Sequence, residues 1–167
     1  DAIGAGLPVA SMRTDVLGAI RAARRWPALA ISYRDEVMPD PALLHFTTTE
    51  PYGVVARIVA YNHPLLFAVK GTLAALVAGN TVVLKVADKT PASAWLLGDL
   101  LAKAFPAGVI NIVTGDASTA GALVAHPEVR RIAFTGSARV GRLIQEQAAR
   151  VGVKNVSLEL GGKNAMV

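Results

Sequence analysis

The chain has 167 residues, of which 53% are hydrophobic and 17% are charged, and its mean hydropathy is +0.43. This composition excludes a disordered protein and predicts one domain with more apolar surface than a single core can bury. The net charge is +5, but the basic residues are scattered, and the apolar runs are shorter than the roughly 18 residues of a membrane span. We therefore expect no nucleic-acid partner, no membrane partner and a cytoplasmic location. Cysteine is absent, which excludes disulfides, thiolate metal sites and a cysteine nucleophile within these residues.

The first fifty residues differ in pattern from the rest. A helix is predicted over Thr14 to Trp26, with three arginines on its polar side. Ser32 to Pro41 is polar and is expected to form turns. Leu43 to Thr49 alternates in the manner of an exposed strand, and such a strand could form an arm that pairs with another chain.

From Thr47 onward, apolar strands alternate with helices. Strands are predicted over residues 54–61, 81–86, 109–113, 131–135 and 153–160. Helices are predicted over residues 64–78, 93–105, 119–125 and 138–151. Short connections between such elements are typical of βαβ units, so the predicted fold class is α/β: a Rossmann-like open parallel sheet with helices on both faces. Ala165 to Val167 resemble the start of another apolar element, so we expect the chain to be a piece of a larger protein.

The segment Phe134 to Gly141 places a glycine turn where a predicted strand gives way to a helix. The free N–H groups and dipole of that helix would favour a phosphate beside Gly136, with the Ser137 hydroxyl as a further donor. The alternative is a plain turn in which Ser137 caps the helix. The motif by itself does not choose between these interpretations.

A second glycine turn follows the last predicted strand, in the segment Leu158 to Lys163. Gly161 and Gly162 would let a flat ligand ring approach the backbone closely. Glu159 lies within the apolar strand end, where loss of water around the carboxylate would suit a general base. The alternative is a structural carboxylate paired with Lys163 or an arginine, and the motif alone favours it.

Two other strand ends carry polar side chains. Lys85 ends a strand and Asp88 follows it; an ammonium and a carboxylate there suit a nucleotide ribose, or form a salt bridge in a loop. Asn62 follows the first strand, where its amide could donate to a developing oxyanion or cap the next helix. All these candidates fall at the carboxyl ends of parallel strands, on one edge of the sheet, which favours a ligand site. The three histidines have no metal-ligand spacing, so we expect no metal.

The order and spacing of the motifs closely resemble the aldehyde dehydrogenase superfamily over residues 14 to 167. The most specific are Leu-Glu-Leu-Gly-Gly-Lys at 158–163 and Phe-Thr-Gly-Ser at 134–137. The resemblance implies oxidation of an aldehyde to a carboxylic acid with NAD or NADP: a cysteine thiolate adds to the aldehyde, hydride leaves to the nicotinamide, and water hydrolyses the thioester. In that family the cysteine follows the last motif by tens of residues, so the resemblance implies a fragment without its nucleophile.

The resemblance assigns residue roles by matching position. Asn62 matches the oxyanion-stabilising amide, and Glu159 matches the base that activates the hydrolytic water. Lys85 and Asp88 match contacts to the adenosine ribose. The other cofactor contacts that it implies are Gly136, Ser137, Val140 and Gly141 on the pyrophosphate and adenine side, Leu160 and Gly161 next to the nicotinamide, and Val59 and Tyr61 beside Asn62.

The resemblance also implies a domain division and an assembly. Residues 54–167 correspond to an incomplete dinucleotide-binding domain, and residues 1–53 to an N-terminal helix with a segment of an oligomerisation arm. Family members form dimers and tetramers through that arm, so we expect a homo-oligomer.

The chain departs from the family pattern at several positions. The family's Trp-Lys pair is Lys70-Gly71 here, so a lysine often linked to proton relay is missing or displaced. Asp88 stands where glutamate is common. A carboxylate there would repel a 2′-phosphate and favours NAD, while the adjacent Lys89 leaves NADP possible.

Two other functions remain open. The chain could be a stand-alone nucleotide-binding or interaction module without catalysis. It could instead resemble a coenzyme-A-acylating relative, which sends its thioester to a thiol; Glu159 counts against this alternative because that branch commonly lacks the base.

Overall fold

The computed structural model describes residues 1–163, and the apolar element expected at Ala165 to Val167 lies outside the described residues. Its main feature is a five-stranded sheet in the order β5-β4-β3-β6-β7, with every neighbouring pair parallel. The strands are β3 (Val54–Ile58), β4 (Thr81–Lys85), β5 (Ile110–Val113), β6 (Val129–Gly136) and β7 (Asn155–Leu160). The chain adds strands outward from β3 in one direction and then from β6 in the other, as in doubly wound folds.

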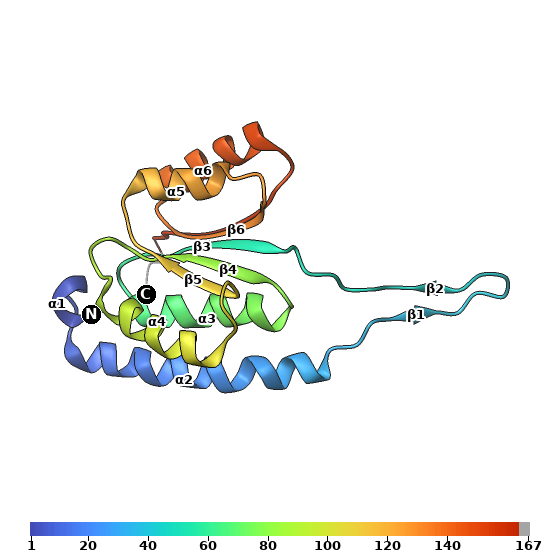
Figure 1. Cartoon of the computed structure of the whole chain (residues 1–167), viewed down its shortest axis with the longest axis horizontal. Helices are drawn as coiled ribbons and strands as arrows, with labels where there is room; N and C mark the ends of the chain where they lie inside the picture. Colours follow the sequence, from blue (N-terminus) through green and yellow to red (C-terminus); the bar gives the residue numbers. More distant parts are fainter. Residues whose placement is uncertain (164–167) are drawn as a thin grey trace.

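Two pairs of helices cover the two faces of the sheet. One face carries α3 (Pro64–Val77) and α4 (Ala92–Ala104) over the β3–β4–β5 half, and the other carries α5 (Ala117–Ala125) and α6 (Ala138–Val151) over the β6–β7 half (Figure 1). The predicted α/β class, with helices on both faces, is therefore confirmed. Because each pair covers only half of its face, the α3 side of β6 and β7 has no helix over it in residues 1–163.

The core follows from the alternation of side chains along the central strand. Ala56 and Ile58 of β3 face α5 and α6 and pack with Ile132 and Phe134 of β6. Val55 points the other way, into a second cluster beneath α3 and α4. A strand buried on both faces needs a nearly continuous apolar sequence, and this pattern is what predicted β3.

Some element ends differ from the prediction. The first strand of the sheet ends at Ile58 instead of residue 61, and Tyr61 is 50% exposed. The last strand begins at Asn155 instead of Val153, which is fully exposed. That strand, β7, lies at the sheet edge and is exposed at both ends.

An outer layer is formed by α2 (Val9–Ser32), which packs along α3 and follows the short helix α1 (Ala2–Ala5). The helix α2 extends well beyond the predicted Thr14 to Trp26 and continues through Pro27. Gly18 allows the close approach of α2 to α3, because a Cβ there would lie 3.1 Å from Leu66 Cδ1. The domain division at residue 53 stays a prediction, since α2 packs against the same layer that covers the sheet.

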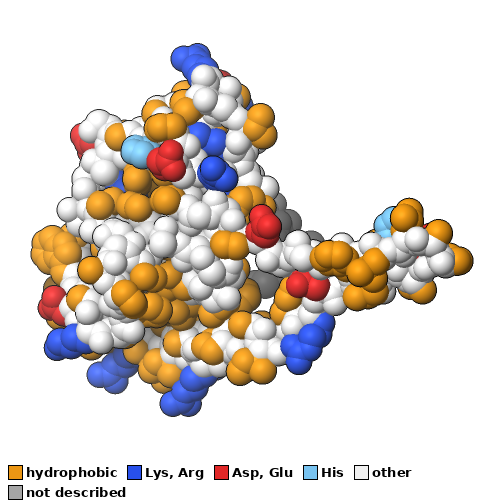
Figure 2. Space-filling model, turned by 45° about the vertical axis from the view of Figure 1, so that its right-hand side comes forward, with side chains coloured by type: hydrophobic (Ala, Val, Ile, Leu, Met, Phe, Trp, Pro, Cys, Tyr) orange, Lys and Arg blue, Asp and Glu red, His pale blue; other side chains and the backbone are white. Residues whose placement is uncertain are grey.

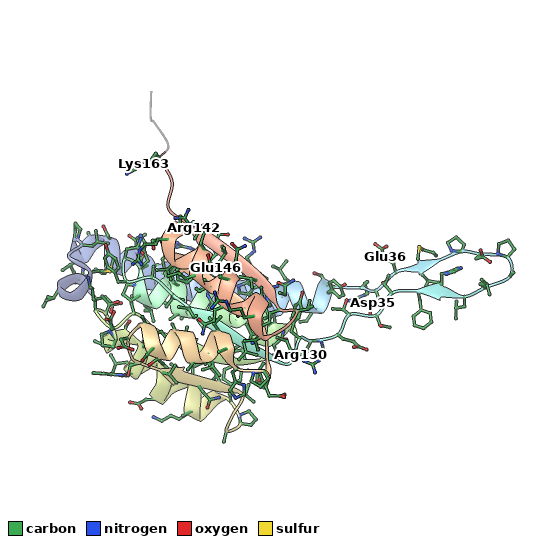
Figure 3. All side chains as sticks on the ribbon, turned by 90° about the horizontal axis from the view of Figure 1, so that it is seen from above. Asp35, Glu36, Arg130, Arg142, Glu146 and Lys163 are labelled. Carbon is green, nitrogen blue, oxygen red and sulfur yellow. The ribbon has the colours of Figure 1, made fainter. Side chains whose placement is uncertain are left out.

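Between α2 and the sheet, a hairpin of β1 (Val37–Met38) and β2 (His45–Phe46) projects away from the body (Figure 1). Figure 3 places Asp35 and Glu36 at its base. The prediction of turns throughout Ser32 to Pro41 is wrong at Val37 and Met38, because two residues are too few to show an alternating pattern. Backbone hydrogen bonding closes the base: the Thr47 N–H donates to the Glu36 carbonyl over 2.9 Å. Figure 2 shows hydrophobic side chains gathered on the hairpin, and those exposed are Val37, Met38, Leu43, Leu44 and Phe46.

Candidate functional site

An open cavity of about 1470 Å³ extends along the sheet to its carboxyl edge and is lined by every candidate residue except Gly141. These residues are Val59, Tyr61, Asn62, Lys85, Asp88, Gly136, Ser137, Val140, Glu159, Leu160 and Gly161. Gly141 lies behind the cavity wall in α6, where an added Cβ would come within 3.0 Å of Leu160 Cδ2. Its role is to let α6 approach β7, so the structure does not show it as a direct ligand contact.

The cavity crosses the edge of the sheet from one face to the other. Lys85 pairs in register with Ile58 and shares its face, on the side of α5 and α6. Glu159 is the register partner of Thr135, whose side chain lies on the opposite face from its neighbour Phe134. The two ionisable candidates are therefore separated by the sheet edge, an arrangement that suits an elongated ligand.

Lys85 is buried without a partner. The residue is only 7% exposed, yet its ammonium has no hydrogen-bond acceptor and no ion-pair partner in the part of the chain that the structure describes. The alternative of a loop salt bridge with Asp88 is thus not found. Because Lys85 lines the cavity, its ammonium can donate to an oxygen-bearing ligand there.

Asp88 and Lys89 are neighbours in the chain, but only Asp88 lines the cavity. The Asp88 Oδ1 accepts a hydrogen bond of 3.1 Å from the Lys89 backbone N–H, and Asp88 lines the cavity. The Lys89 Nζ lies 5.8 Å from the centre of the Tyr61 ring, in a cation–π contact. Lys89 is therefore engaged with Tyr61 and does not line the cavity beside Lys85.

The N-terminus of α6 forms another part of the wall. The Ser137 Oγ accepts a hydrogen bond of 3.3 Å from the Val140 N–H, so the capping interpretation of Ser137 is realised, although the residue also lines the cavity. The facing wall comes from the start of α5, where Ala117 and Ala120 line the cavity with Asp116. Asp116 and Ala120 were not among the predicted site residues; their position after the carboxyl end of β5 was the available signal.

Asp116 caps α5. Its Oδ1 accepts hydrogen bonds from the Ser118 hydroxyl and the Ser118 backbone N–H, at 2.6 and 2.9 Å. These hydrogen bonds hold the pKa of Asp116 below its usual range. Asp116 is exposed, so water surrounds the capping group.

Asn62 sits in a loop held from both sides. His63 Nδ1 lies 2.7 Å from Oδ2 of the buried Asp15 in α2, and the Thr90 hydroxyl donates to the Tyr61 carbonyl over 3.4 Å. The N-cap of α3 is His63, without a side-chain cap, and the Asn62 amide makes no hydrogen bond within residues 1–163. The alternative of Asn62 as a helix cap is therefore not realised, and its amide is available to a ligand.

Glu159 lines the cavity but is exposed. The expectation that it is buried in an apolar strand end is wrong for the described residues, because β7 is an edge strand and no helix covers its α3 side. The alternative of an ion pair is not found either: neither Lys163 nor any arginine lies within 4.0 Å of its carboxylate in residues 1–163.

Arg57 is a cavity residue that the sequence analysis missed. It is the charged residue of the central strand β3, and its Nη2 donates to the Thr135 hydroxyl over 3.4 Å. Burial lowers the pKa of Arg57, while the negative charge of Glu159 acts in the opposite direction. A single arginine in an apolar run gives little signal in sequence, since only the fold shows what it faces.

Residues 1–163 contain no group of three or more His, Cys, Asp or Glu side chains arranged to hold a metal ion. In the same residues, no helix has both the length and the apolar character needed to cross a membrane.

Comparison with known proteins relates the whole chain to one family. Residues 1–167 match the model of the aldehyde dehydrogenase family. An aldehyde dehydrogenase of Talaromyces stipitatus, tropH, is 42% identical over 166 residues, which cover 97% of this chain and 32% of that protein. Retinaldehyde dehydrogenase 3 of Homo sapiens is 45% identical over 92% of this chain and 30% of its own. The chain thus spans about a third of the length of these relatives.

A solved structure shows that the fold extends over nearly the whole chain. A double mutant of betaine aldehyde dehydrogenase from Staphylococcus aureus, in complex with NAD⁺, matches with a TM-score of 0.91 at 31% identity. The match covers 98% of this chain and 33% of that one. The cavity at the sheet edge therefore belongs to a fold that holds a dinucleotide in that protein.

Proposed function

The chain belongs to the aldehyde dehydrogenase family, and we propose that it is the nucleotide-binding core of an enzyme that oxidises an aldehyde to a carboxylic acid with NAD. The observation that carries this proposal is the single cavity that brings together Asn62, Lys85 and Glu159 from three strand ends. The ammonium of Lys85 and the amide of Asn62 make no hydrogen bond within residues 1–163 and both residues line this cavity, so both groups can donate to a ligand.

The residues present fit a dinucleotide. Lys85 and Asp88 would bind the adenosine ribose hydroxyls, with one donor and one acceptor. The N-terminus of α6 would bind the pyrophosphate through its free N–H groups, and the small side chains Ala117 and Ala120 leave room for the adenine beside Val140. When bound, NAD supplies the acceptor for the hydride of the substrate.

The chain's own residues would then act on the substrate. The Asn62 amide would donate to the aldehyde oxygen as negative charge develops on it. The Glu159 carboxylate would take a proton from the water that hydrolyses the thioester. These 167 residues hold no cysteine, so the thiolate of the reaction has to come from outside them.

NAD is the proposed cofactor in preference to NADP. The Asp88 carboxylate in the cavity wall would repel a 2′-phosphate. The cation–π contact of Lys89 with Tyr61 supports this choice, because Lys89 then does not offset the Asp88 charge. A homo-oligomer formed through the β1–β2 hairpin is proposed as well, supported by the exposed hydrophobic side chains of that arm. The cytoplasmic location stays a prediction of the sequence, which cell fractionation would test.

Titration calorimetry and turnover assays would test the function. The 167-residue chain should bind NAD and should give no aldehyde-dependent NADH, because it has no thiol to form the hemithioacetal. Steady turnover by the purified chain would contradict the proposal that the thiolate comes from outside these 167 residues. If the chain joined to a cysteine-bearing remainder also stayed inactive with aldehydes while binding NAD, the alternative of a non-catalytic nucleotide-binding module would replace the proposal.

A further inference from the structure

Arg57 is an unusual residue for its position. It lies on β3, the central strand of the sheet, among the apolar residues Val55, Ala56 and Ile58. Its Nε is buried and has no hydrogen-bond partner in the described residues, and its only side-chain hydrogen bond there is the long one to Thr135. A partly buried guanidinium with so few hydrogen bonds lowers the stability of the fold unless a negative charge or a ligand interacts with it.

The Arg57 guanidinium packs directly against Gly71 of α3, where there is no side chain. A Cβ at position 71 would lie 2.6 Å from Arg57 Nε, 2.8 Å from Cζ and 3.0 Å from Nη2. Any larger residue there would push the guanidinium aside. Gly71 is also the position at which the family resemblance places a lysine, so in this chain a cation enters the same space from β3 and not from α3.

The register of the sheet directs Arg57 toward Glu159. Arg57 shares its face with Ala133 and, two residues further along β6, with Thr135. Thr135 is in turn the register partner of Glu159 on β7. Arg57, Thr135 and Glu159 thus lie on one face of three adjacent strands, with Thr135 and Glu159 two residues nearer the carboxyl edge than Arg57, and all three line the cavity. The charge of Glu159 also acts on the pKa of Arg57, which is consistent with their proximity.

We propose that Arg57 is a positioning residue for Glu159: its guanidinium, seated over Gly71 and linked to Thr135, holds the Glu159 carboxylate turned into the cavity for thioester hydrolysis. In that step water gives a proton to Glu159, its oxygen bonds to the carbonyl carbon, and the carbon–sulfur bond breaks with the electron pair staying on sulfur. A cation on the same face of the sheet attracts the carboxylate and so restricts its orientation. The inference rests on the proposed function, since Glu159 acts as a base only in that reaction.

The competing role is purely structural, with Arg57 joining β3 to β6 through Thr135. The two roles differ in which kinetic step they affect. A structural defect would lower the amount of active enzyme, and with it the NADH burst and the steady rate together. A positioning role affects thioester hydrolysis and spares the earlier formation of NADH.

The test uses the complete enzyme, with this chain joined to the part that carries the cysteine, and measures NADH by stopped flow. For Arg57→Gln we expect an unchanged burst amplitude and a steady-state kcat lower by about tenfold, part of the roughly hundredfold or more that a general base supplies. Arg57→Lys should recover most of the loss. Arg130→Gln is the matched control: Arg130 is exposed, lies on β6 (Figure 3) and does not line the cavity, so its kinetics should equal those of the parent.

A second variant distinguishes loss of the cation from a folding defect in Arg57→Gln. In Arg57→Gln/Gly71→Lys the cation would come from α3, and we expect the double variant to regain part of the hydrolysis rate. A normal steady rate in Arg57→Gln would overturn the inference, as would an equal loss of burst and steady rate without recovery in Arg57→Lys. A parent enzyme that produced no NADH from any aldehyde would instead overturn the proposed function itself.

Discussion

Gly136 and Gly161 both line the cavity, but an alanine is expected to disturb core packing only at Gly136. Comparing the two alanine variants therefore distinguishes an effect on stability from an effect on ligand binding. At Gly136 a Cβ would lie 2.4 Å from Phe134 Cζ and 3.0 Å from Cε2. Phe134 is only 6% exposed and belongs to the cluster beneath α5 and α6, so its ring has little room to move. At Gly161 a Cβ would meet nothing within 4 Å, and the backbone there is not in the left-handed region.

The expected losses of stability follow from the clash at Gly136 and the open space at Gly161. Forcing a methyl group into a packed core costs about 1–3 kcal/mol, and a chain of this size loses about 2–4 °C of Tm per kcal/mol. We therefore expect Gly136→Ala to lower the Tm of the chain by about 2–12 °C. Gly161→Ala should change the free energy of unfolding by less than about 0.5 kcal/mol. Both variants should weaken NAD binding, Gly136→Ala by moving the cavity wall and Gly161→Ala by preventing the close approach of the nicotinamide ring.

The assay combines thermal unfolding followed by circular dichroism with NAD titration calorimetry on the same preparations. The reasoning is refuted if Gly136→Ala melts at the parent temperature, because the Phe134 ring cannot then lie where the structure places it. Equal destabilisation by both alanines would also contradict it. If Gly161→Ala kept parent-like stability and parent-like NAD affinity, the placement of the nicotinamide against Gly161 would be wrong.

Three further predictions concern the ionisable residues of the cavity. In the complete enzyme, Glu159→Gln should retain the NADH burst and lose most of the steady turnover by stopped flow, since hydride loss precedes hydrolysis; equal loss of both phases would assign Glu159 another role. Asp88→Ser should raise the KM for NAD and narrow the gap to NADP in steady-state kinetics, whereas a parent kcat/KM for NADP at or above that for NAD would overturn the choice of cofactor. Asp116 has a depressed pKa in the folded chain, so its ionised form stabilises the fold above the unfolded value of about 3.9, and that contribution disappears as the pH falls through the folded value. Urea melts should therefore show Asp116→Asn less stable than the parent at neutral pH and equal to it in strong acid; a difference that persisted in acid would contradict the capping role.

Local patterns predicted most elements correctly where the cause of structure is local. The helix α6 spans Ala138 to Val151, as expected, because a strongly amphipathic sequence lies between the Ser137 cap and Gly152. The same reasoning failed for Pro27, which was expected to lie beyond the end of a helix. Packing of α2 along α3 outweighs the one hydrogen bond that proline removes. In the β1–β2 hairpin, β2 lies within the predicted strand Leu43 to Thr49, whereas β1 was missed because Val37 and Met38 carry no periodic pattern of their own.

The sequence by itself determined the class of the sheet, the strand ends that carry polar groups and the resemblance to a family, because each of these depends on residues that are neighbours in the chain. Only the tertiary structure decided which strand lies at the edge. That choice leaves Glu159 exposed instead of buried, and it places Arg57, Thr135 and Glu159 on one face of three adjacent strands. The hydrogen bond between Arg57 and Thr135 joins residues 78 positions apart, and such a pairing follows from strand order and register, which no local periodicity encodes.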